Sequence, residues 1–275
     1  MTQKKNYLIL CLFALIFPLT VLAEDRIENQ LGENPSYNLS YYISLCNQYI
    51  TRGMTQSGDN AALQGGLDFT HNSGLYFSTW TSNISWLKDN GSYTQSWQEL
   101  DLYGGYATTI AELDMGYNVG LAYYFYPGNP VPNSGYASPN TLELNNQINY
   151  KWLTGVLHYT LSSVDSQVEN AQGSYYAEIN ANIPIFESDF TANFHTGYQY
   201  YAGAMQAPCP TGELSNNACY SYADLLIGVS KKFNENITAS TYFTSTNAKS
   251  NNYLFNNKNI GRNLLTFFVQ KSWGN

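Results

Sequence analysis

The feature that most constrains the fold of this chain is an alternation of apolar and polar side chains that recurs along most of its length. Within residues 175–183, the odd positions are Tyr, Ala or Ile, whereas most even positions are Glu or Asn. A period of two is typical of a β-strand with one apolar and one polar face. The pattern predicts strands at residues 37–49, 61–71, 74–84, 98–108, 113–126, 140–151, 153–162, 174–183, 189–200, 220–233, 237–247 and 263–273.

The connections between these segments alternate between long and short. A long connection follows the first strand and every second strand after it, and one of them contains the Pro-rich stretch 127–139. The others, such as residues 71–74 and 151–152, are only long enough for turns. Long loops at one end and short turns at the other are typical of outer-membrane barrels, whose strands span the bilayer with roughly 9–11 residues each. We therefore predict an all-β, transmembrane, up-and-down antiparallel β-barrel of about 12 strands.

Composition excludes several other classes of protein. Only 12% of the residues are charged, against about 25% in soluble domains, and 16% are aromatic, which argues against disorder. A helical membrane bundle needs about 20 consecutive apolar residues per span, and no such run follows the N-terminus. The pI of about 4.8 argues against nucleic acid as a partner. A soluble lipocalin-like barrel is the main rival, but it would bury its apolar face around a ligand and would rarely need so many strands.

The N-terminus has the features of a secretory signal peptide. Lys4 and Lys5 precede an apolar stretch, and Val21-Leu22-Ala23 provides small residues for cleavage. We expect a signal peptide at residues 1–23, a short periplasmic segment at 24–36 and an outer-membrane barrel at 37–275. The protein is then exported to the bacterial outer membrane, with both termini of the barrel in the periplasm.

Three cysteines remain after the predicted cleavage. Cys209 and Cys219 lie in one Pro- and Asn-rich loop and are expected to form a disulfide in an oxidising compartment. A metal site is the rival interpretation, but neither His nor further Cys residues lie nearby. Cys46 is left unpaired and is expected to be a packed, inert thiol.

Ordered motifs between Tyr37 and Gly128 give the chain a family resemblance. They are Arg52-Gly53-Met54-Thr55-Gln56-Ser57, Gln64-Gly65-Gly66-Leu67-Asp68, Ser73-Gly74-Leu75-Tyr76, Trp80-Thr81-Ser82-Asn83, Glu99-Leu100-Asp101-Leu102-Tyr103-Gly104-Gly105-Tyr106 and Tyr123-Tyr124-Phe125-Tyr126-Pro127-Gly128, followed later by Gly228-Val229-Ser230-Lys231. In this order they resemble the TorF-like porins, outer-membrane proteins of proteobacteria that are mostly uncharacterised. The resemblance implies a pore, with outer-membrane lipid and the barrel-assembly machinery as partners.

The chain departs from that family at two places. Gln48 stands where members tend to carry an acid, and Gly274 and Asn275 follow Trp273 where members tend to end on an aromatic residue. The second departure weakens the usual barrel-assembly signal.

The polar faces of the predicted strands would line the lumen. They carry seven predicted pore-lining carboxylates: Asp68, Glu99, Asp101, Asp114, Glu143, Glu178 and Asp224. Arg52 is expected near the outer mouth and Lys232 near the periplasmic end. Because rings of acidic side chains favour cations, we predict a porin for the passive diffusion of small polar or cationic solutes. A largely plugged lumen remains the alternative, since narrow barrels can be filled by their own side chains.

Two further function classes are open to a barrel of this kind. An enzyme would need a catalytic constellation, but His158 and His195 are predicted at mid-strand with neither Ser nor an acid beside them, so no catalytic residue, metal or cofactor is expected. A structural or adhesive surface protein acting through its long loops is the other alternative. The orientation of Trp80 stays open, because Leu75 and Phe77 compete with Tyr76 and Trp80 for the outer face.

Overall fold

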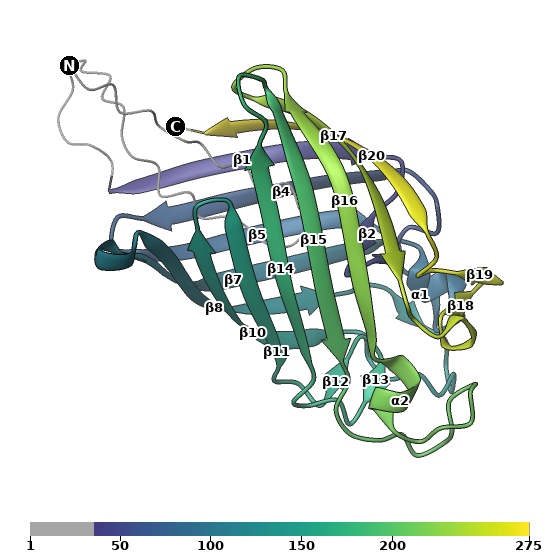
Figure 1. The fold of residues 1–275 in the computed structure, drawn as a ribbon. Helices are drawn as coiled ribbons and strands as arrows, with labels where there is room; N and C mark the ends of the chain where they lie inside the picture. The colour runs from purple at the N-terminus through teal and green to yellow at the C-terminus, as the bar shows by residue number, and fades with distance from the viewer. Residues whose placement is uncertain (1–35, 275) are drawn as a thin grey trace, which may run out of the picture.

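A computed structural model describes residues 36–274, and twelve of its strands form one closed antiparallel barrel (Figure 1). The predicted signal peptide, and nearly all of the predicted segment at 24–36, lie outside the described residues. The barrel strands are β1 (Tyr37–Cys46), β4 (Ala62–His71), β5 (Leu75–Asn83), β7 (Gln98–Ile110), β8 (Met115–Phe125), β10 (Thr141–Tyr150), β11 (Leu153–Thr160), β14 (Tyr175–Pro184), β15 (Phe190–Tyr200), β16 (Tyr222–Lys232), β17 (Ile237–Thr246) and β20 (Leu264–Gly274).

Each barrel strand pairs with its sequence neighbours in the barrel, and β1 closes the ring against β20. Closure runs in register from Ser40 opposite Gly274 to Cys46 opposite Phe268. The predicted all-β, up-and-down barrel is therefore confirmed, with strand ends that differ from the predicted ones by only a few residues. No helix within residues 36–274 is long and apolar enough to cross a membrane.

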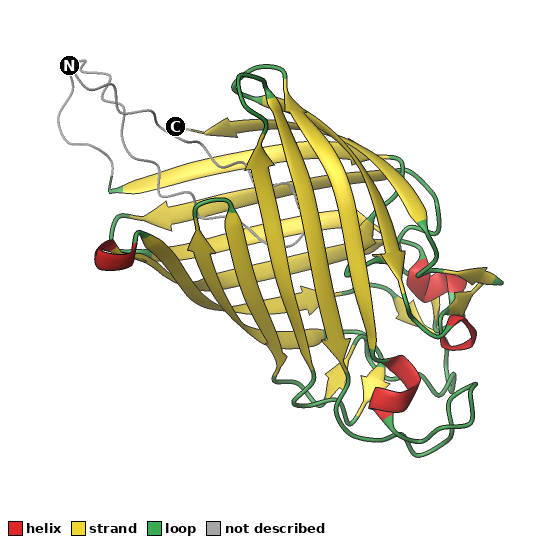
Figure 2. Cartoon of the chain, in the orientation of Figure 1, coloured by secondary structure: helices red, strands yellow, loops and turns green. Residues whose placement is uncertain are grey.

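The connections divide between the two ends of the barrel, as predicted. Short turns, one of which contains η1 (Ala111–Leu113), lie at the end where β1 begins and β20 finishes (Figure 2). The long loops at the other end carry small elements of their own. These are β2 (Ile50–Thr51), β3 (Met54–Thr55), α1 (Trp86–Asp89), β6 (Tyr93–Gln95), β9 (Asn129–Pro130), β12 (Val164–Asp165), β13 (Val168–Glu169), α2 (Asn216–Tyr220), η2 (Ser250–Asn252), β18 (Leu254–Phe255) and β19 (Lys258–Asn259).

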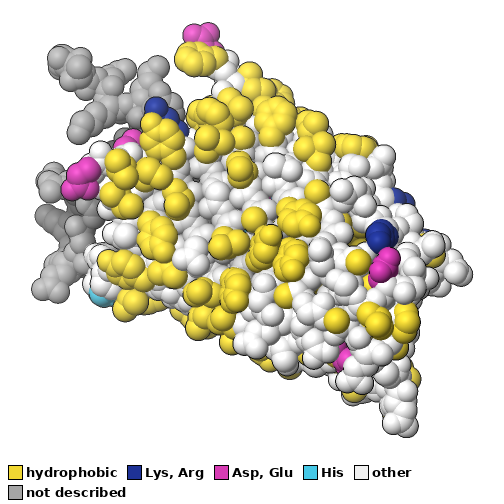
Figure 3. Space-filling model, turned by 60° about the horizontal axis from the view of Figure 1, so that its bottom comes forward, with side chains coloured by type: hydrophobic (Ala, Val, Ile, Leu, Met, Phe, Trp, Pro, Cys, Tyr) yellow, Lys and Arg dark blue, Asp and Glu magenta, His cyan; other side chains and the backbone are white. Residues whose placement is uncertain are grey.

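On the face that Figure 3 shows, apolar side chains are spread over the outside of the barrel wall, and charged side chains lie toward its two ends. At mid-strand, several large apolar side chains are each at least 40% exposed: Leu67, Leu121, Ile179, Ile227 and Phe267. Lysines at the turn end lie beside aromatic rings. Lys231 Nζ is 4.9 Å from the ring centre of Phe190, and Lys271 Nζ is 5.0 Å from that of Trp273. The barrel is thus apolar outside, where a soluble protein would be polar.

Two aromatic clusters fill the loop end of the barrel. The first contains the aromatic residues Tyr49, Trp80, Trp86, Tyr103, Tyr124, Tyr126 and Phe268, with several smaller apolar residues. Trp80 therefore points inward, with 3% of its surface exposed. The second cluster consists of Met54, Tyr201, Tyr222, Tyr253 and Ile260. Both clusters include residues of the first long loop, so this loop packs into the barrel end.

Facing glycines let an aromatic ring lie against the sheet between β7 and β8. Gly105 is paired with Gly120, and the ring of Tyr76 lies over them while its hydroxyl donates to Asn118 Oδ1 at 2.9 Å. A Cβ on Gly105 would stand 2.3 Å from the carbonyl oxygen of Val119, which belongs to the backbone and cannot move aside cheaply. This close approach requires glycine.

Gly105→Ala is expected to lower the free energy of unfolding by about 1–3 kcal/mol, the usual cost of overpacking. The measurement is urea unfolding of the barrel folded in phospholipid vesicles. Gly155→Ala is the matched control, because a Cβ on this strand glycine would meet no atom within 4 Å. Equal stabilities of the two variants would contradict the role given to Gly105.

Candidate functional site

The first long loop places a β-hairpin inside the lumen. Strands β2 and β3 pair around a two-residue turn, Arg52 and Gly53, whose φ angles are +47° and +75°. Positive φ at both central residues is typical of a tight type I′ turn. A Cβ on Gly53 would stand 2.5 Å from Thr246 Cγ2 and 2.7 Å from Asp224 Cβ, so the hairpin tip touches the barrel wall. Tyr222 also donates from its hydroxyl to the carbonyl oxygen of Arg52, at 2.9 Å.

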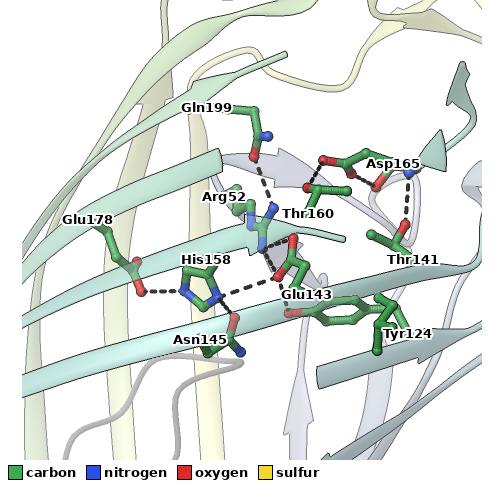
Figure 4. Close-up of polar contacts among 12 residues, drawn as sticks. Arg52, Tyr124, Thr141, Glu143, Asn145, His158, Thr160, Asp165, Glu178 and Gln199 are labelled. Carbon is green, nitrogen blue, oxygen red and sulfur yellow. Dashed lines mark hydrogen bonds and ion pairs between the residues drawn. The ribbon is translucent and has the colours of Figure 1, made fainter. Parts of the chain in front are cut away.

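The guanidinium of Arg52 reaches wall residues on β10, β14 and β15 (Figure 4). Its Nη2 donates to both carboxylate oxygens of Glu143, at 2.9 and 2.8 Å, and its Nη1 donates to Gln199 Oε1 at 3.0 Å. The guanidinium carbon also lies 4.7 Å from the ring centre of Tyr176. The side chain of Arg52 is 17% exposed and that of Glu143 only 1%. Arg52 was expected near the outer mouth. Its partners Glu143 and Gln199 lie within two residues of the loop-side ends of β10 and β15, so Arg52 reaches the inner wall at the loop end of the barrel.

From Glu143, alternating acidic and histidine side chains continue across adjacent strands. His158 lies 3.5 Å from Glu143 and 3.4 Å from Glu178. His195 lies 3.3 Å from Glu178 and 2.7 Å from Asp224. We call these residues, with Arg52, the charge chain. The expectation that no acid lies beside the two histidines is wrong: strand register brings Glu178 and Asp224 next to them from separate parts of the sequence.

Neutral side chains hold the charge chain in place. The hydroxyl of Tyr124 donates to Glu143 Oε2 at 3.0 Å, and that of Tyr176 donates to Asp224 Oδ2 at 2.9 Å. Asn145 Oδ1 lies 3.0 Å from His158 Nδ1, and Asn180 Oδ1 lies 2.7 Å from His195 Nδ1. Buried charges are tolerated only when paired and hydrogen-bonded, and these contacts meet that requirement.

Glu99 and Asp101 form a second acidic group on β7. Their side chains are 1% and 0% exposed. Tyr126 donates to Glu99 Oε1, and Tyr103 donates to Asp101 Oδ2, each at 2.8 Å. Neither carboxylate takes part in an ion pair among the described residues. The pair therefore sits behind tyrosines of the first aromatic cluster rather than at a free lumen wall.

The remaining two predicted lumen carboxylates lie apart from each other. Asp68 lies on the inward face of β4, in the turn-side half of the barrel, and opposes Ser78 and Ser40 in register. Asp114 is not on a strand, because it follows η1 in a left-handed conformation with φ +50°. Its side chain is exposed in the turn before β8. The predicted strand began two residues too early, which moved Asp114 into the lumen.

A buried carboxyl group lies in the fourth long loop. Asp165 is 1% exposed and accepts hydrogen bonds from Thr160 and Ser166 at 2.9 and 3.0 Å. Burial, followed by the nearby charge of Glu143, raises its pKa to about 6, although Arg52 acts in the opposite direction.

The cysteines lie as the sequence predicts. The predicted disulfide between Cys209 and Cys219 is confirmed in the fifth long loop. Cys46 is buried, and its thiol lies 3.5 Å from the carbonyl oxygen of Ala62.

The hairpin in the lumen is the feature that strand periodicity missed. Thr51-Arg52-Gly53-Met54 does contain a turn signal, a glycine where φ must be positive. That signal predicts a hairpin but not its direction. The described residues contain no group of three or more His, Cys, Asp and Glu residues arranged to hold a metal ion.

Residues 30–273 match a family described as "Bacterial protein of unknown function (Gcw_chp)". Curated protein sequences give no match. Among solved structures, Omp33 of Acinetobacter baumannii is similar over 86% of this chain and 98% of its own, at 6% identity and a TM-score of 0.42. An outer-membrane channel from Pseudomonas putida F1 is similar over 90% of this chain and 100% of its own, at 10% identity and a TM-score of 0.43. The function therefore has to follow from the chain's own residues.

Glu143→Gln is expected to destabilise the folded barrel strongly, because it leaves the charge of Arg52 without its carboxylate. Breaking a buried ion pair costs about 3–5 kcal/mol, and the partial exposure of Arg52 favours the lower end. The control is Asp59→Asn, which removes a surface carboxylate that contacts Lys258 and Arg262 and should cost less than about 1 kcal/mol. Urea unfolding of both variants measures the difference, and similar losses would contradict a buried pair.

Asp165→Asn is expected to stabilise the protein only above the pKa of the unfolded carboxyl group. The folded pKa of about 6 exceeds the unfolded value near 3.8, so ionisation destabilises the fold as pH rises through that window and the cost is constant above it. At about 1.36 kcal/mol per pKa unit, the variant should gain up to about 3 kcal/mol at about pH 8 and nothing at about pH 3. Unfolding at both pH values, with the exposed Glu169→Gln as control, measures the gain; a pH-independent gain would contradict this assignment.

Proposed function

The chain belongs to the Gcw_chp family of bacterial proteins of unknown function, and from its own residues we propose that it is an outer-membrane barrel that passes small polar or cationic solutes by passive diffusion. One observation carries the proposal: a closed barrel that is apolar outside and polar inside. The apolar exterior suits lipid, in which every backbone group must be bonded within the protein and a closed barrel has no edge. The inward polar side chains would provide a path for solutes.

Lysines and aromatic rings at the turn end of the barrel support an orientation in which this end faces the periplasm. Lys231, Lys271 and Lys151 lie near aromatic rings at the turn end, where a lysine can extend its charge to the headgroups. The short turns and both ends of the barrel would then face the periplasm, and the long loops would face outward. A signal peptide, lipid contact and the barrel-assembly machinery all belong to this proposal.

Charge in the lumen favours cations. All the predicted carboxylates except Asp114 lie on inward strand faces, and Glu143, Glu178 and Asp224 are paired within the charge chain. Asp68 takes part in no ion pair among residues 36–274 and lies in the turn-side half, beyond the hairpin. Acidic groups along a pore favour cations, so Asp68 is the carboxylate expected to contribute most to selectivity.

A largely plugged barrel that acts through its loops is the second candidate. The observation that favours it is the hairpin, whose tip contacts the wall through Arg52 and whose Met54 packs in the second aromatic cluster. We propose no catalytic role: His195 is engaged by Asp224 and by the hydroxyl of Tyr176, 2.9 Å from its Nε2.

The test is single-channel conductance of the folded protein in a planar bilayer under a potassium chloride gradient. Discrete current steps with a cation-selective reversal potential are expected. Asp68→Asn should lower the potassium-to-chloride permeability ratio, because it removes a lumen charge. The matched control Asp114→Asn, which removes a carboxylate from an exposed turn, should leave the ratio unchanged.

Absence of current from folded wild-type protein would contradict an open channel. A variant with residues 50–55 replaced by a short Gly-Ser linker would then separate the two candidates. Current from this variant alone would show that the hairpin plugs a competent pore. Absence of current from both the wild-type protein and the linker variant would favour a barrel that acts through its loops.

A further inference from the structure

We propose that the barrel wall around Glu143 is a binding site for the guanidinium group of a solute, and that Arg52 occupies this site as a built-in ligand. The inference rests on the proposed channel function and names its solute class: small cations that carry a guanidinium or a similar planar amidinium group. Arg52 would be the resting occupant that such a solute displaces.

The wall forms this site without help from the hairpin. Glu143 lies on β10, Gln199 on β15 and Tyr176 on β14, and each is at most 2% exposed. They provide a carboxylate, an amide oxygen and an aromatic face, all directed at the guanidinium of Arg52. Tyr124 holds the carboxylate with a 3.0 Å hydrogen bond of its own. The receptor groups therefore stay in place if Arg52 leaves.

The arrangement suits a guanidinium better than an ammonium. Two different nitrogens of Arg52 donate to two acceptors, Glu143 and Gln199, while the guanidinium lies near the ring of Tyr176. A planar guanidinium has several donors in fixed directions and stacks on aromatic faces, whereas an ammonium is a strongly hydrated point charge. Selection between cations of equal charge should follow from this difference.

Three features make Arg52 an exchangeable occupant. A purely structural plug would gain as much from apolar residues, because a buried ion pair seldom stabilises more than well-packed apolar side chains. Arg52 also has a left-handed backbone conformation, φ +47°, which costs free energy for any residue with a Cβ. Its side chain keeps 17% of its surface exposed, so the site is within reach of solvent.

The test is calorimetric titration of the folded barrel in detergent micelles with methylguanidinium chloride and, separately, methylammonium chloride. In Arg52→Ala, methylguanidinium is expected to bind at least about tenfold more tightly than methylammonium, because only the planar cation can use both acceptors and the ring. Wild-type protein should bind methylguanidinium at least about tenfold more weakly than Arg52→Ala, because Arg52 competes from within the same molecule at high effective concentration. Adding Glu143→Gln to Arg52→Ala should abolish the binding.

Arg262→Ala is the matched control, because it removes the other described arginine, which pairs with Asp59 at the loop surface. It should bind methylguanidinium as weakly as wild type does. If Arg52→Ala does not fold, Arg52→Lys replaces it: lysine keeps the charge but not the planar donors, so methylguanidinium should bind this variant more tightly than wild type. No preference for methylguanidinium, or an equal gain in Arg262→Ala, would overturn the proposal.

Binding and conduction are measured separately, so the two proposals can fail independently. Tight, Glu143-dependent binding in a barrel that never conducts would retain the site and reject the channel. Conduction without guanidinium selectivity in Arg52→Ala would retain the channel and reject the site.

Discussion

Closure of the sheet is the constraint on which the rest of this structure depends. Because β1 pairs with β20, every barrel strand has a hydrogen-bonding neighbour on both sides, and the wall needs no edge protection. Closure also separates two surfaces completely. The apolar face is turned outward, so the interior is left with polar and charged side chains that must satisfy one another.

The charge chain shows how charged side chains inside the barrel are paired and hydrogen-bonded. Glu143, Glu178 and Asp224 would be costly to bury alone. His158 and His195 lie between these carboxylates along the wall, and Arg52 pairs with Glu143. The positive charge of Arg52 comes from a loop rather than from a barrel strand. A single hairpin tip thus supplies a guanidinium to the charge chain, whereas Asp68, Glu99 and Asp101 take part in no ion pair among the described residues.

Local rules predicted the wall well because each strand follows its own alternation. The strand predicted at residues 174–183 followed directly from its alternation, and the position of Cys209 and Cys219 in one loop of an exported chain predicted their disulfide. The predictions that failed concern features that depend on contacts between distant segments or on the exact end of a strand. The direction of the Arg52 hairpin depends on partners on several wall strands, and the acids beside His195 arrive through strand register. Trp80 could not be oriented, because both faces of its strand offer apolar side chains.

The contact between Arg52 and Glu143 joins residues 91 positions apart and needs several wall strands already side by side. Contacts of such long sequence separation form late, after the entropy of closing the intervening chain has been lost. Interactions absent from the folding transition state act mainly on the unfolding rate. The hairpin would therefore have little influence on how quickly the barrel assembles, and much on how long an assembled barrel survives.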